Sequence, residues 1–346
     1  MGTEVQWGIL GHATIARKCV IGAIQKSCNG TVRALASRTP DRARETAARH
    51  GIPLLYDSYE AVLADPAVTA VYIPLPNHLH LPWTLRALAA GKHVLCEKPL
   101  ACSAAEAREM AAAARAADRF LMEGFMYRFH PRSRRVKALV DQGAIGEPRL
   151  VRVAFCYPMA ADLIESGANA RLQPGMGGGA LLDVGCYGVS LARWMMGAEP
   201  VHVQAQASYH PGGVDWHMVA SLNFGDRRLA VVEASFIAAL QQTYSVVGQG
   251  GAIDLPHDAF IPWEKDAAFR LRGPDEEAGT RHLVDGADEY QRMVEHFADV
   301  VRGDAPAFFT PAESIANMRV LDALAAAARS GERLVLEAIG NADDHE

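Results

Sequence analysis

The fold is decided by a short segment near the N-terminus, Gly8-Ile9-Leu10-Gly11-His12-Ala13-Thr14-Ile15-Ala16. From Gly11 it has the form G-x-A-x-x-A, a relaxed version of the G-x-G-x-x-G/A turn between a strand and a helix. Gly11 permits the tight turn, Ala13 is small enough for a pyrophosphate to approach, and Ala16 allows close packing of helix on strand. The N–H groups around His12, Thr14 and Ile15 would then face the phosphates. The alternative is a plain glycine turn, which the position at the start of a βαβ unit disfavours.

The rest of the first 125 residues continues this pattern of apolar strands and helices. Helical patterns cover Thr14–Gln25 and Leu81–Ala90, and an alanine-rich helix begins at Ser103. Apolar strand-like runs follow one another at Val5–Leu10, Thr31–Ala36, Ala70–Leu75, His93–Cys96 and Phe120–Phe125. Continuous apolar strands between helices are typical of a parallel sheet covered on both faces. Residues 1–125 are therefore predicted to form a doubly wound α/β domain of the Rossmann type.

Residues 126–346 have a different pattern, and we predict a second, α+β domain that binds the substrate and forms oligomers. A helix is expected over His130–Gln142, and two more near Asp288–Val301 and Pro311–Arg329. Strand-like segments lie between them at Leu150–Cys156, Val201–Ser208, Met218–Phe224, Arg228–Phe236 and Tyr244–Val247. Their alternation and the turns between them favour a large open sheet, mostly antiparallel.

Composition and charge exclude several classes of protein. Half of the 346 residues are hydrophobic, 21% are charged, and the net charge is −6 with the signs interspersed, so no basic face for nucleic acid is expected. No apolar run is long enough for a membrane span, and no signal peptide is visible. The six cysteines show no CxxC or metal-type spacing. We therefore expect reduced thiols, no metal, no membrane and a cytoplasmic protein.

The end of the second strand indicates which dinucleotide is bound. NAD binders commonly place an acid about 20 residues after the glycine turn, to hold the ribose 2′-OH. Here the strand ends Ala36-Ser37-Arg38, without an acid. A guanidinium pairs with a 2′-phosphate and a hydroxyl can donate to it. The sequence therefore favours NADP(H), with Ser37 and Arg38 at the phosphate; the alternative for Arg38 is a solvated surface charge.

Three further stretches carry a resemblance to a known family. They are Ile73-Pro74-Leu75-Pro76-Asn77-His78-Leu79-His80, Gly91-Lys92-His93-Val94-Leu95-Cys96-Glu97-Lys98-Pro99 and Gly177-Gly178-Gly179-Ala180-Leu181-Leu182-Asp183-Val184-Gly185-Cys186-Tyr187. Together they resemble the glucose–fructose oxidoreductase/inositol dehydrogenase (Gfo/Idh/MocA) family over nearly the whole chain. The likeness is greatest to NADP-dependent xylose dehydrogenases, dihydrodiol dehydrogenases and nucleotide-sugar ketoreductases.

This resemblance implies roles for three residues. Lys98 matches the family's catalytic lysine, Asp183 its substrate-side acid, and Tyr187 its proton donor, where many members have His. Lys98 also follows a parallel strand at the edge where open α/β sheets bind ligands. Asp183 and Tyr187 are four residues apart and share a helix face. Taken singly, the alternatives are a surface lysine, a first-turn acid and a core aromatic.

Several secondary candidates lie near the same strand ends and motifs. Pro74, Leu75, Asn77, His80, Glu97 and Lys98 are expected to contact the cofactor, although a loop histidine is more often only solvated. Candidate substrate contacts are Tyr127, Arg128 and Arg171, in addition to Lys98, Asp183 and Tyr187. Arg128 has the equally good alternative of a salt bridge.

The leading hypothesis is an NADP(H)-dependent oxidoreductase that moves a hydride to or from a carbinol or carbonyl carbon of a sugar-like substrate. The alternatives are an NAD-dependent glycosidase, which Ser37 and Arg38 disfavour, and a non-catalytic dinucleotide-binding regulator, which should have lost Lys98, Asp183 and Tyr187. The sequence does not identify the sugar, the carbon or the direction of the reaction. The resemblance implies a homodimer or homotetramer formed through the C-terminal sheet.

Overall fold

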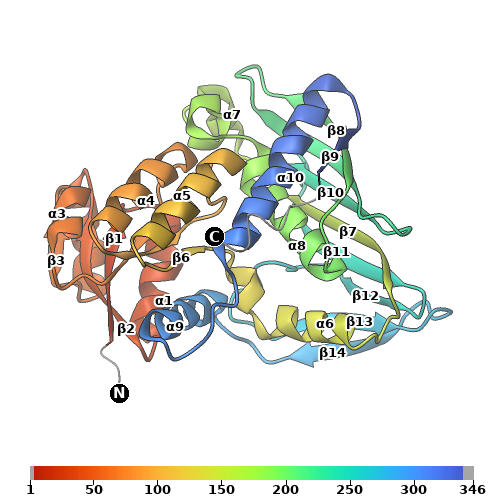
Figure 1. The fold of residues 1–346 in the computed structure, drawn as a ribbon, viewed down its shortest axis with the longest axis horizontal. Coiled ribbons are helices and arrows are strands. Elements are labelled where there is room, and N and C mark those ends of the chain that lie inside the picture. Colours follow the sequence, from red (N-terminus) through yellow and green to blue (C-terminus); the bar gives the residue numbers. More distant parts are fainter. Residues whose placement is uncertain (1–3, 338–346) are drawn as a thin grey trace. The chain divides into compact units, whose positions relative to one another are not determined.

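The computed structural model describes residues 4–337, and the chain forms two compact units (Figure 1). The N-terminal unit contains residues 4–129 together with residues 288–315. The sheet unit contains residues 130–287 and residues 316–337. The sequence analysis assigned all of 126–346 to the second domain. The structure divides the chain differently because a late helix packs on the N-terminal unit.

The N-terminal unit is built on a six-stranded sheet with the order β3-β2-β1-β4-β5-β6. Every pair of neighbouring strands is parallel. This is the Rossmann strand order, and it confirms the predicted doubly wound sheet. The strands are β1 (Val5–Leu10), β2 (Gly30–Ala36), β3 (Leu54–Tyr56), β4 (Ala70–Ile73), β5 (His93–Cys96) and β6 (Leu121–Glu123).

Helices connect these strands, and Figure 1 shows α4 and α5 lying side by side. The helices are α1 (Ile21–Lys26), α2 (Pro40–Arg49), α3 (Tyr59–Ala64), α4 (His80–Ala89) and α5 (Ala104–Ala116). A π-helical turn, Ala16–Val20, precedes α1. Helix α2 begins with proline at its first turn, where a missing N–H costs nothing.

One more helix, α9 (Glu289–Arg302), belongs to this unit although it is encoded after the second sheet. The ring centroid of Phe297 lies 4.8 Å from that of Trp7 and 5.2 Å from that of Phe120. The side-chain amide of Asn29 donates to the Glu295 carbonyl at 2.8 Å and to a carboxylate oxygen of α9 at 2.7 Å. Helix α9 therefore completes the core beneath β1.

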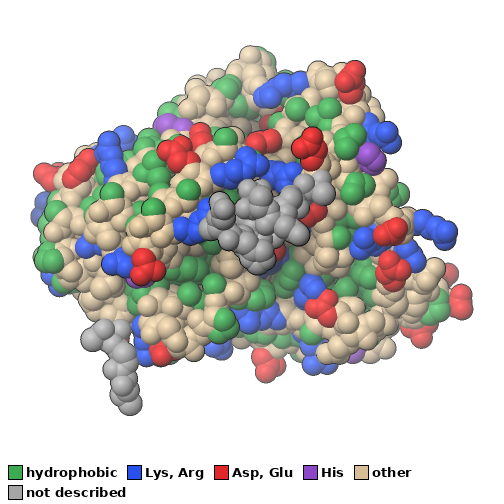
Figure 2. All heavy atoms as spheres, viewed as in Figure 1, with side chains coloured by type: hydrophobic (Ala, Val, Ile, Leu, Met, Phe, Trp, Pro, Cys, Tyr) green, Lys and Arg blue, Asp and Glu red, His purple; other side chains and the backbone are tan. Residues whose placement is uncertain are grey.

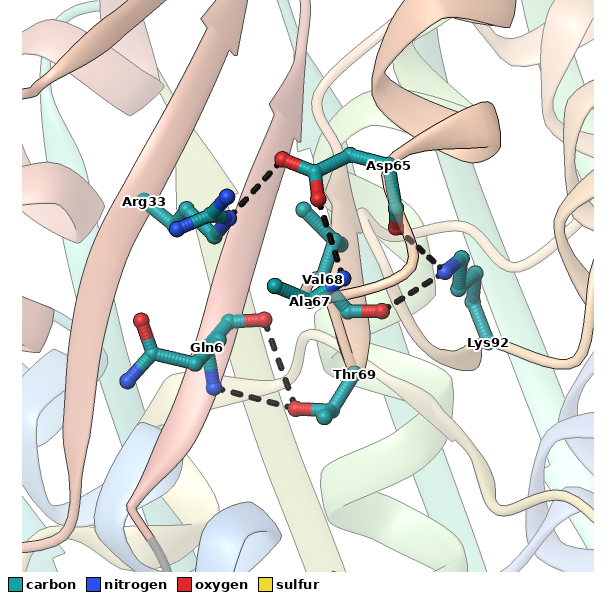
Figure 3. A network of polar contacts seen from close by, with 7 residues as sticks. All are labelled: Gln6, Arg33, Asp65, Ala67, Val68, Thr69 and Lys92. Atoms are coloured by element: carbon teal, nitrogen blue, oxygen red, sulfur yellow. Dashed lines mark hydrogen bonds and ion pairs between the residues drawn. The ribbon is translucent and has the colours of Figure 1, made fainter.

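A buried polar network joins the turn before β4 to β2 and β5 (Figure 3). The Asp65 carboxylate accepts hydrogen bonds from Arg33 Nε at 2.8 Å and from the Ala67 N–H at 2.9 Å. Lys92 Nζ donates to the backbone carbonyls of Asp65 at 2.8 Å and of Val68 at 2.7 Å. Lys92 is only 6% exposed, and this burial lowers its pKa. The network supplies donors to carbonyls that the chain buries here.

The sheet unit contains a nine-stranded sheet with the order β14-β13-β12-β11-β7-β10-β9-β8-β15. Only β7 and β10 are parallel neighbours, and every other pair is antiparallel. This confirms the predicted open, mostly antiparallel sheet. The strands are β7 (Pro148–Cys156), β8 (His202–Tyr209), β9 (Asp215–Asn223), β10 (Leu229–Ser235), β11 (Gln241–Gly248), β12 (Ala252–Leu255), β13 (Ala267–Arg272), β14 (Thr280–Val284) and β15 (Leu334–Val335).

Helix α8 (Cys186–Met196) packs on β7 and β10, and a π-helical turn, Leu181–Gly185, leads into it. The other helices are α6 (Pro131–Asp141), α7 (Ala161–Ser166) and α10 (Pro311–Ser330). A Cβ added at Gly188 would lie 2.6 Å from Val232 Cγ1 of β10. The helix therefore carries glycine where it approaches the sheet most closely, which explains a residue that is otherwise unfavourable in a helix.

Figure 2 shows lysines and arginines interspersed with acids on the face drawn. Within residues 4–337, no helix combines the length and the apolar character needed to cross a membrane. The same residues contain no cluster of His, Cys, Asp or Glu that could hold a metal ion.

Candidate active site

The glycine turn after β1 has the geometry expected from its sequence. Gly11 has φ +123°, a value that side chains disfavour, and its N–H donates to the Ala36 carbonyl at 3.1 Å. A Cβ at Gly11 would lie 3.0 Å from Leu75 Cδ2. The following helical turn begins at Ala13, whose carbonyl accepts from the Arg17 N–H at 3.1 Å.

A pocket of about 510 Å³ opens at this turn. Many residues predicted to bind the cofactor line it, namely Gly11, His12, Ala13, Ser37, Arg38, Pro74 and Leu75. It is also lined by residues that the sequence analysis did not name: Arg17, Thr39, Arg42, Tyr59 and Pro76. The loops after β1, β2 and β4 thus meet at one edge of the sheet, where doubly wound sheets bind ligands.

The charge of this pocket is positive. Three guanidinium groups, those of Arg17, Arg38 and Arg42, line it, and no carboxylate does among the lining residues described. Burial raises the pKa of Tyr59, and the positive charge of Arg38 partly opposes this. Burial and the charge of Arg17 lower the pKa of His12. The pocket is suited to an anionic group.

Ser37 has a more local role than the sequence analysis expected. Its side chain is buried, and its hydroxyl donates to the Thr39 carbonyl at 3.1 Å. The same oxygen accepts from the Thr39 N–H at 3.2 Å. In this arrangement the hydroxyl shapes the turn before α2 and does not donate into the pocket.

His80 is fully buried rather than solvated. Its Nδ1 lies 2.9 Å from the Pro99 carbonyl oxygen and its Nε2 lies 2.7 Å from that of Leu75. Burial lowers its pKa. His80 therefore links the loop after β4 to the turn after β5, where the Lys98-Pro99 peptide is cis. Asn77 begins a short 3₁₀ turn in the same loop and is half-buried.

Glu97 and Lys98 follow β5 directly, and both are half-buried. The Glu97 carboxylate accepts from the Tyr72 hydroxyl at 2.6 Å and from the Lys98 backbone N–H at 3.3 Å. Burial and the charge of Glu97 raise the pKa of Tyr72. Glu97 thus fixes the backbone from which the Lys98 side chain begins.

In the sheet unit, Asp183 is the centre of a polar cluster. Its Oδ2 accepts from Arg171 Nε at 2.8 Å and from the Tyr157 hydroxyl at 2.8 Å. The charge of Asp183 raises the pKa of Arg171 above its usual value. Sequence reasoning missed Tyr157. The only available signal was its position directly after a strand-like run, at Leu150–Cys156.

Tyr187 lies one helical turn after Asp183 and is only 4% exposed. Its ring centroid is 5.2 Å from that of Phe155 and 5.3 Å from that of Phe260. The chain next to Phe260 is fixed because the Arg132 guanidinium donates to the Ala259 carbonyl at 3.0 Å. Aromatic packing therefore holds the tyrosine ring in one orientation.

Tyr127 and Arg128 are buried in the N-terminal unit, 0% and 3% exposed. Arg128 Nη2 lies 3.3 Å from a Glu313 carboxylate oxygen, and its guanidinium lies over the Phe309 ring at 5.0 Å. Of the two roles considered for Arg128, the structure shows the salt bridge. Substrate contact by either residue stays a prediction.

The structure thus brings the predicted residues together in two groups. The glycine turn, Arg38 and the loops after β4 and β5, with Lys98, belong to the N-terminal unit. Arg171, Asp183 and Tyr187 belong to the sheet unit. Thr14 and Ile15 follow the glycine turn but do not line the pocket.

Comparisons with known proteins identify both parts of the chain. Residues 5–125 match the model of an oxidoreductase family with an NAD-binding Rossmann fold, and residues 133–254 match the GFO/IDH/MocA C-terminal domain. The D-xylose 1-dehydrogenase (NADP(+)) 2 of Haloferax volcanii is 38% identical over 335 residues, which cover 96% of this chain and 100% of that protein.

Two solved structures have the same fold over nearly the whole chain. The aldose-aldose oxidoreductase from Caulobacter crescentus, complexed with glycerol, has a TM-score of 0.86 at 27% identity and covers 96% of this chain and 100% of its own. The 3-ketoreductase KijD10 from Actinomadura kijaniata, in complex with NADP and TDP-benzene, has a TM-score of 0.85 at 29% identity. The match covers 94% of this chain and 98% of the KijD10 chain. The glycine turn, the strand order and the whole-length matches agree, and the chain belongs to the GFO/IDH/MocA family of oxidoreductases.

Proposed function

We propose that this protein is an NADP(H)-dependent oxidoreductase that transfers a hydride between the nicotinamide and a carbinol or carbonyl carbon of a sugar or sugar-like substrate. The observation that carries the proposal is the pocket at the glycine turn, lined by Arg17, Arg38 and Arg42 and by no described carboxylate. A 2′-phosphate is the feature of NADP that such a pocket favours, and a carboxylate would repel it. The names of the xylose dehydrogenase and of the KijD10 complex, which both include NADP, support the same choice.

Bound NADP(H) supplies or accepts the hydride, and the residues of this chain must manage the substrate oxygen and its proton. Tyr187 is the proposed proton donor and acceptor. A phenol with a pKa near 10 is a poor base at neutral pH, but a neighbouring ammonium favours the phenolate. Lys98 is the proposed source of that charge, and it also polarises the substrate oxygen. Asp183 orients the substrate hydroxyl. Arg171 and Tyr157 hold the Asp183 carboxylate in place.

Two substrate classes fit these roles. A simple aldose would be oxidised at a carbinol carbon, and a nucleotide-linked ketosugar would be reduced at a carbonyl carbon. Relatives named for each class, the xylose dehydrogenase and the 3-ketoreductase, resemble this chain over nearly its full length. A panel of aldoses, ketosugars, dihydrodiols and nucleotide sugars, followed by nicotinamide absorbance with both cofactors, distinguishes them.

The decisive variant is Tyr187→Phe, which keeps the ring against Phe155 and Phe260 and removes the hydroxyl. General acid–base assistance is worth about 10²–10⁴-fold, so kcat should fall by that factor while NADP binding is retained. Lys98→Met should lower kcat by at least the same factor. The fall in kcat of the double variant should be far smaller than the product of the two single falls, because the residues act as a unit. Retention of more than about a third of wild-type turnover by Tyr187→Phe, where chemistry limits the rate, would show that another group moves the proton.

A further inference from the structure

The helical segment that carries Asp183 and Tyr187 begins without a side-chain cap of its own. The Asp183 N–H donates to the Gly179 carbonyl at 3.0 Å, so Gly179 occupies the N-cap position. A serine or aspartate there would accept from the N–H groups of the first turn, but glycine has no side chain to do so. The N–H groups of Ala180 and Leu181 therefore need an acceptor from elsewhere in the chain.

Asp215, the first residue of β9, provides this acceptor. Its Oδ2 accepts from the Leu181 N–H at 2.6 Å. A Cβ at Gly179, where φ is +117°, would overlap the Asp215 carboxylate. The glycine thus leaves the space in which a carboxylate from another strand caps the helix.

The neighbouring glycine ties the same point to Arg171. The Gly179 N–H donates to the Arg171 carbonyl at 2.9 Å, and a Cβ at Gly178 would lie 2.5 Å from the same carbonyl oxygen. The backbone of Arg171 and the start of the helix therefore meet at Gly179. Arg171 in turn donates to Asp183. Gly178, Gly179 and Asp215 therefore form one small junction, which contacts both Arg171 and the start of the helix that carries Asp183.

We propose that Asp215 is a positioning residue of the active site, which fixes the start of the helix so that Asp183 and Tyr187 are held in their working orientation. The proposal deepens the function proposed above and rests on it. Asp215 touches neither cofactor nor substrate in this account and acts only through the first helical turn. A small displacement of reacting groups is expensive, about 10²-fold in rate for 1 Å.

The environment of Asp215 fits this role. Burial raises its pKa to about 6, while the hydrogen bonds from backbone N–H groups and the charge of Arg329 act in the opposite direction. At neutral pH the group is therefore mostly ionised, as suits the positive end of a helix. An asparagine would keep one acceptor oxygen for Leu181, and asparagine is as good an N-cap as aspartate.

The test compares Asp215→Ala with Asp215→Asn in the full-length protein. Asp215→Ala should lower kcat about 10–100-fold and leave the Kd for NADP unchanged, because the pocket lies in the N-terminal unit. The backbone amides of residues 180–185 should exchange hydrogen about fivefold faster, the worth of a typical cap. Asp215→Asn should retain amide protection and turnover within about threefold of wild type. If Asp215→Ala fails to fold, Asp215→Ser serves in its place.

Asp288→Ala is the matched control. Asp288 caps α9 by accepting from the N–H groups of Tyr290 and Gln291. Its loss should speed exchange in α9 and leave kcat unchanged. Faster exchange in Asp215→Ala with unchanged kcat, or an Asp215→Asn as impaired as Asp215→Ala, would overturn the proposal. If Tyr187→Phe is active, the proposed proton donor is wrong, whereas the exchange data still show whether Asp215 fixes the helix.

Discussion

Arg38 is the side chain on which cofactor choice should depend most. It lines the pocket together with Tyr59, at the position where NAD binders carry an acid. We expect Arg38→Ala to raise the KM for NADP much more than the KM for NAD. The loss of binding free energy for NADP should be about 1.5–3 kcal/mol, which is the contribution of a charge-assisted hydrogen bond.

Arg44→Ala is the control for this prediction, because Arg44 is an exposed α2 residue that pairs with Asp41 and does not line the pocket. It should leave both KM values unchanged. If Arg38→Ala raises the KM for NADP and the KM for NAD by the same factor, the guanidinium does not bind the 2′-phosphate.

At the residue scale, sequence reasoning located the pocket but not its full lining. Gly11, Ala13 and Arg38 could be identified because their spacing from β1 and β2 is a property of the chain. Arg42 and Tyr59 could not, because their approach to the pocket depends on how α2 and α3 fold back over the sheet. The burial of His80 was equally invisible, since its two carbonyl partners come from separate loops.

At the scale of elements, Lys92 supports the alignment of β4 beside β5. Lys92→Met keeps most of the buried volume but leaves the carbonyls of Asp65 and Val68 without this donor. We expect the free energy of unfolding to fall by about 2–4 kcal/mol, measured by urea denaturation, because buried unsatisfied groups pay their desolvation cost. Lys18→Met, at an exposed position, should change it by less than about 0.5 kcal/mol. If Lys92→Met lowered the free energy of unfolding by as little as Lys18→Met, a water molecule would have to replace the ammonium as donor to the two carbonyls.

Long apolar runs made the central strands predictable, whereas the edge of the second sheet was not. Strands β13 and β14 carry exposed arginines, Arg270 and Arg281, and a half-buried histidine, His282, so their pattern resembles that of a loop. The short helix α7 has no buried residue and gave no periodic signal. The π-helical turn Leu181–Gly185 packs against the sheet, and no local pattern in the sequence indicated it.

At the scale of the whole molecule, we predict a homodimer or homotetramer formed through the nine-stranded sheet. Val219 and Leu229 lie on neighbouring strands, on the face opposite that of the buried Ala220 and Ala230, and are 42% and 47% exposed. A second copy of the chain would cover these two exposed apolar side chains. Light scattering at micromolar concentration should give an oligomer. Replacing Val219 and Leu229 together by glutamate should shift it toward monomer.

Leu163→Glu is the control for the oligomer, because Leu163 is 39% exposed on α7, outside the sheet. It should leave the mass unchanged. A wild-type monomer at micromolar concentration would contradict the prediction.

The order of elements along the chain could be predicted, but their grouping into units could not. Nothing in the sequence of residues 288–315 distinguishes a helix that packs on the first sheet from one that packs on the second.

This grouping has a consequence for synthesis on the ribosome. Residues 4–129 are translated long before α9 (Glu289–Arg302), and the interval at about 5–20 residues per second is roughly 8–30 s. During that time Trp7 and Phe120 lack the ring of Phe297, and the Asn29 amide lacks its two acceptors. We therefore expect the nascent chain to carry an incomplete nucleotide-binding unit with exposed aromatic side chains, and to bind chaperones until α9 has been translated.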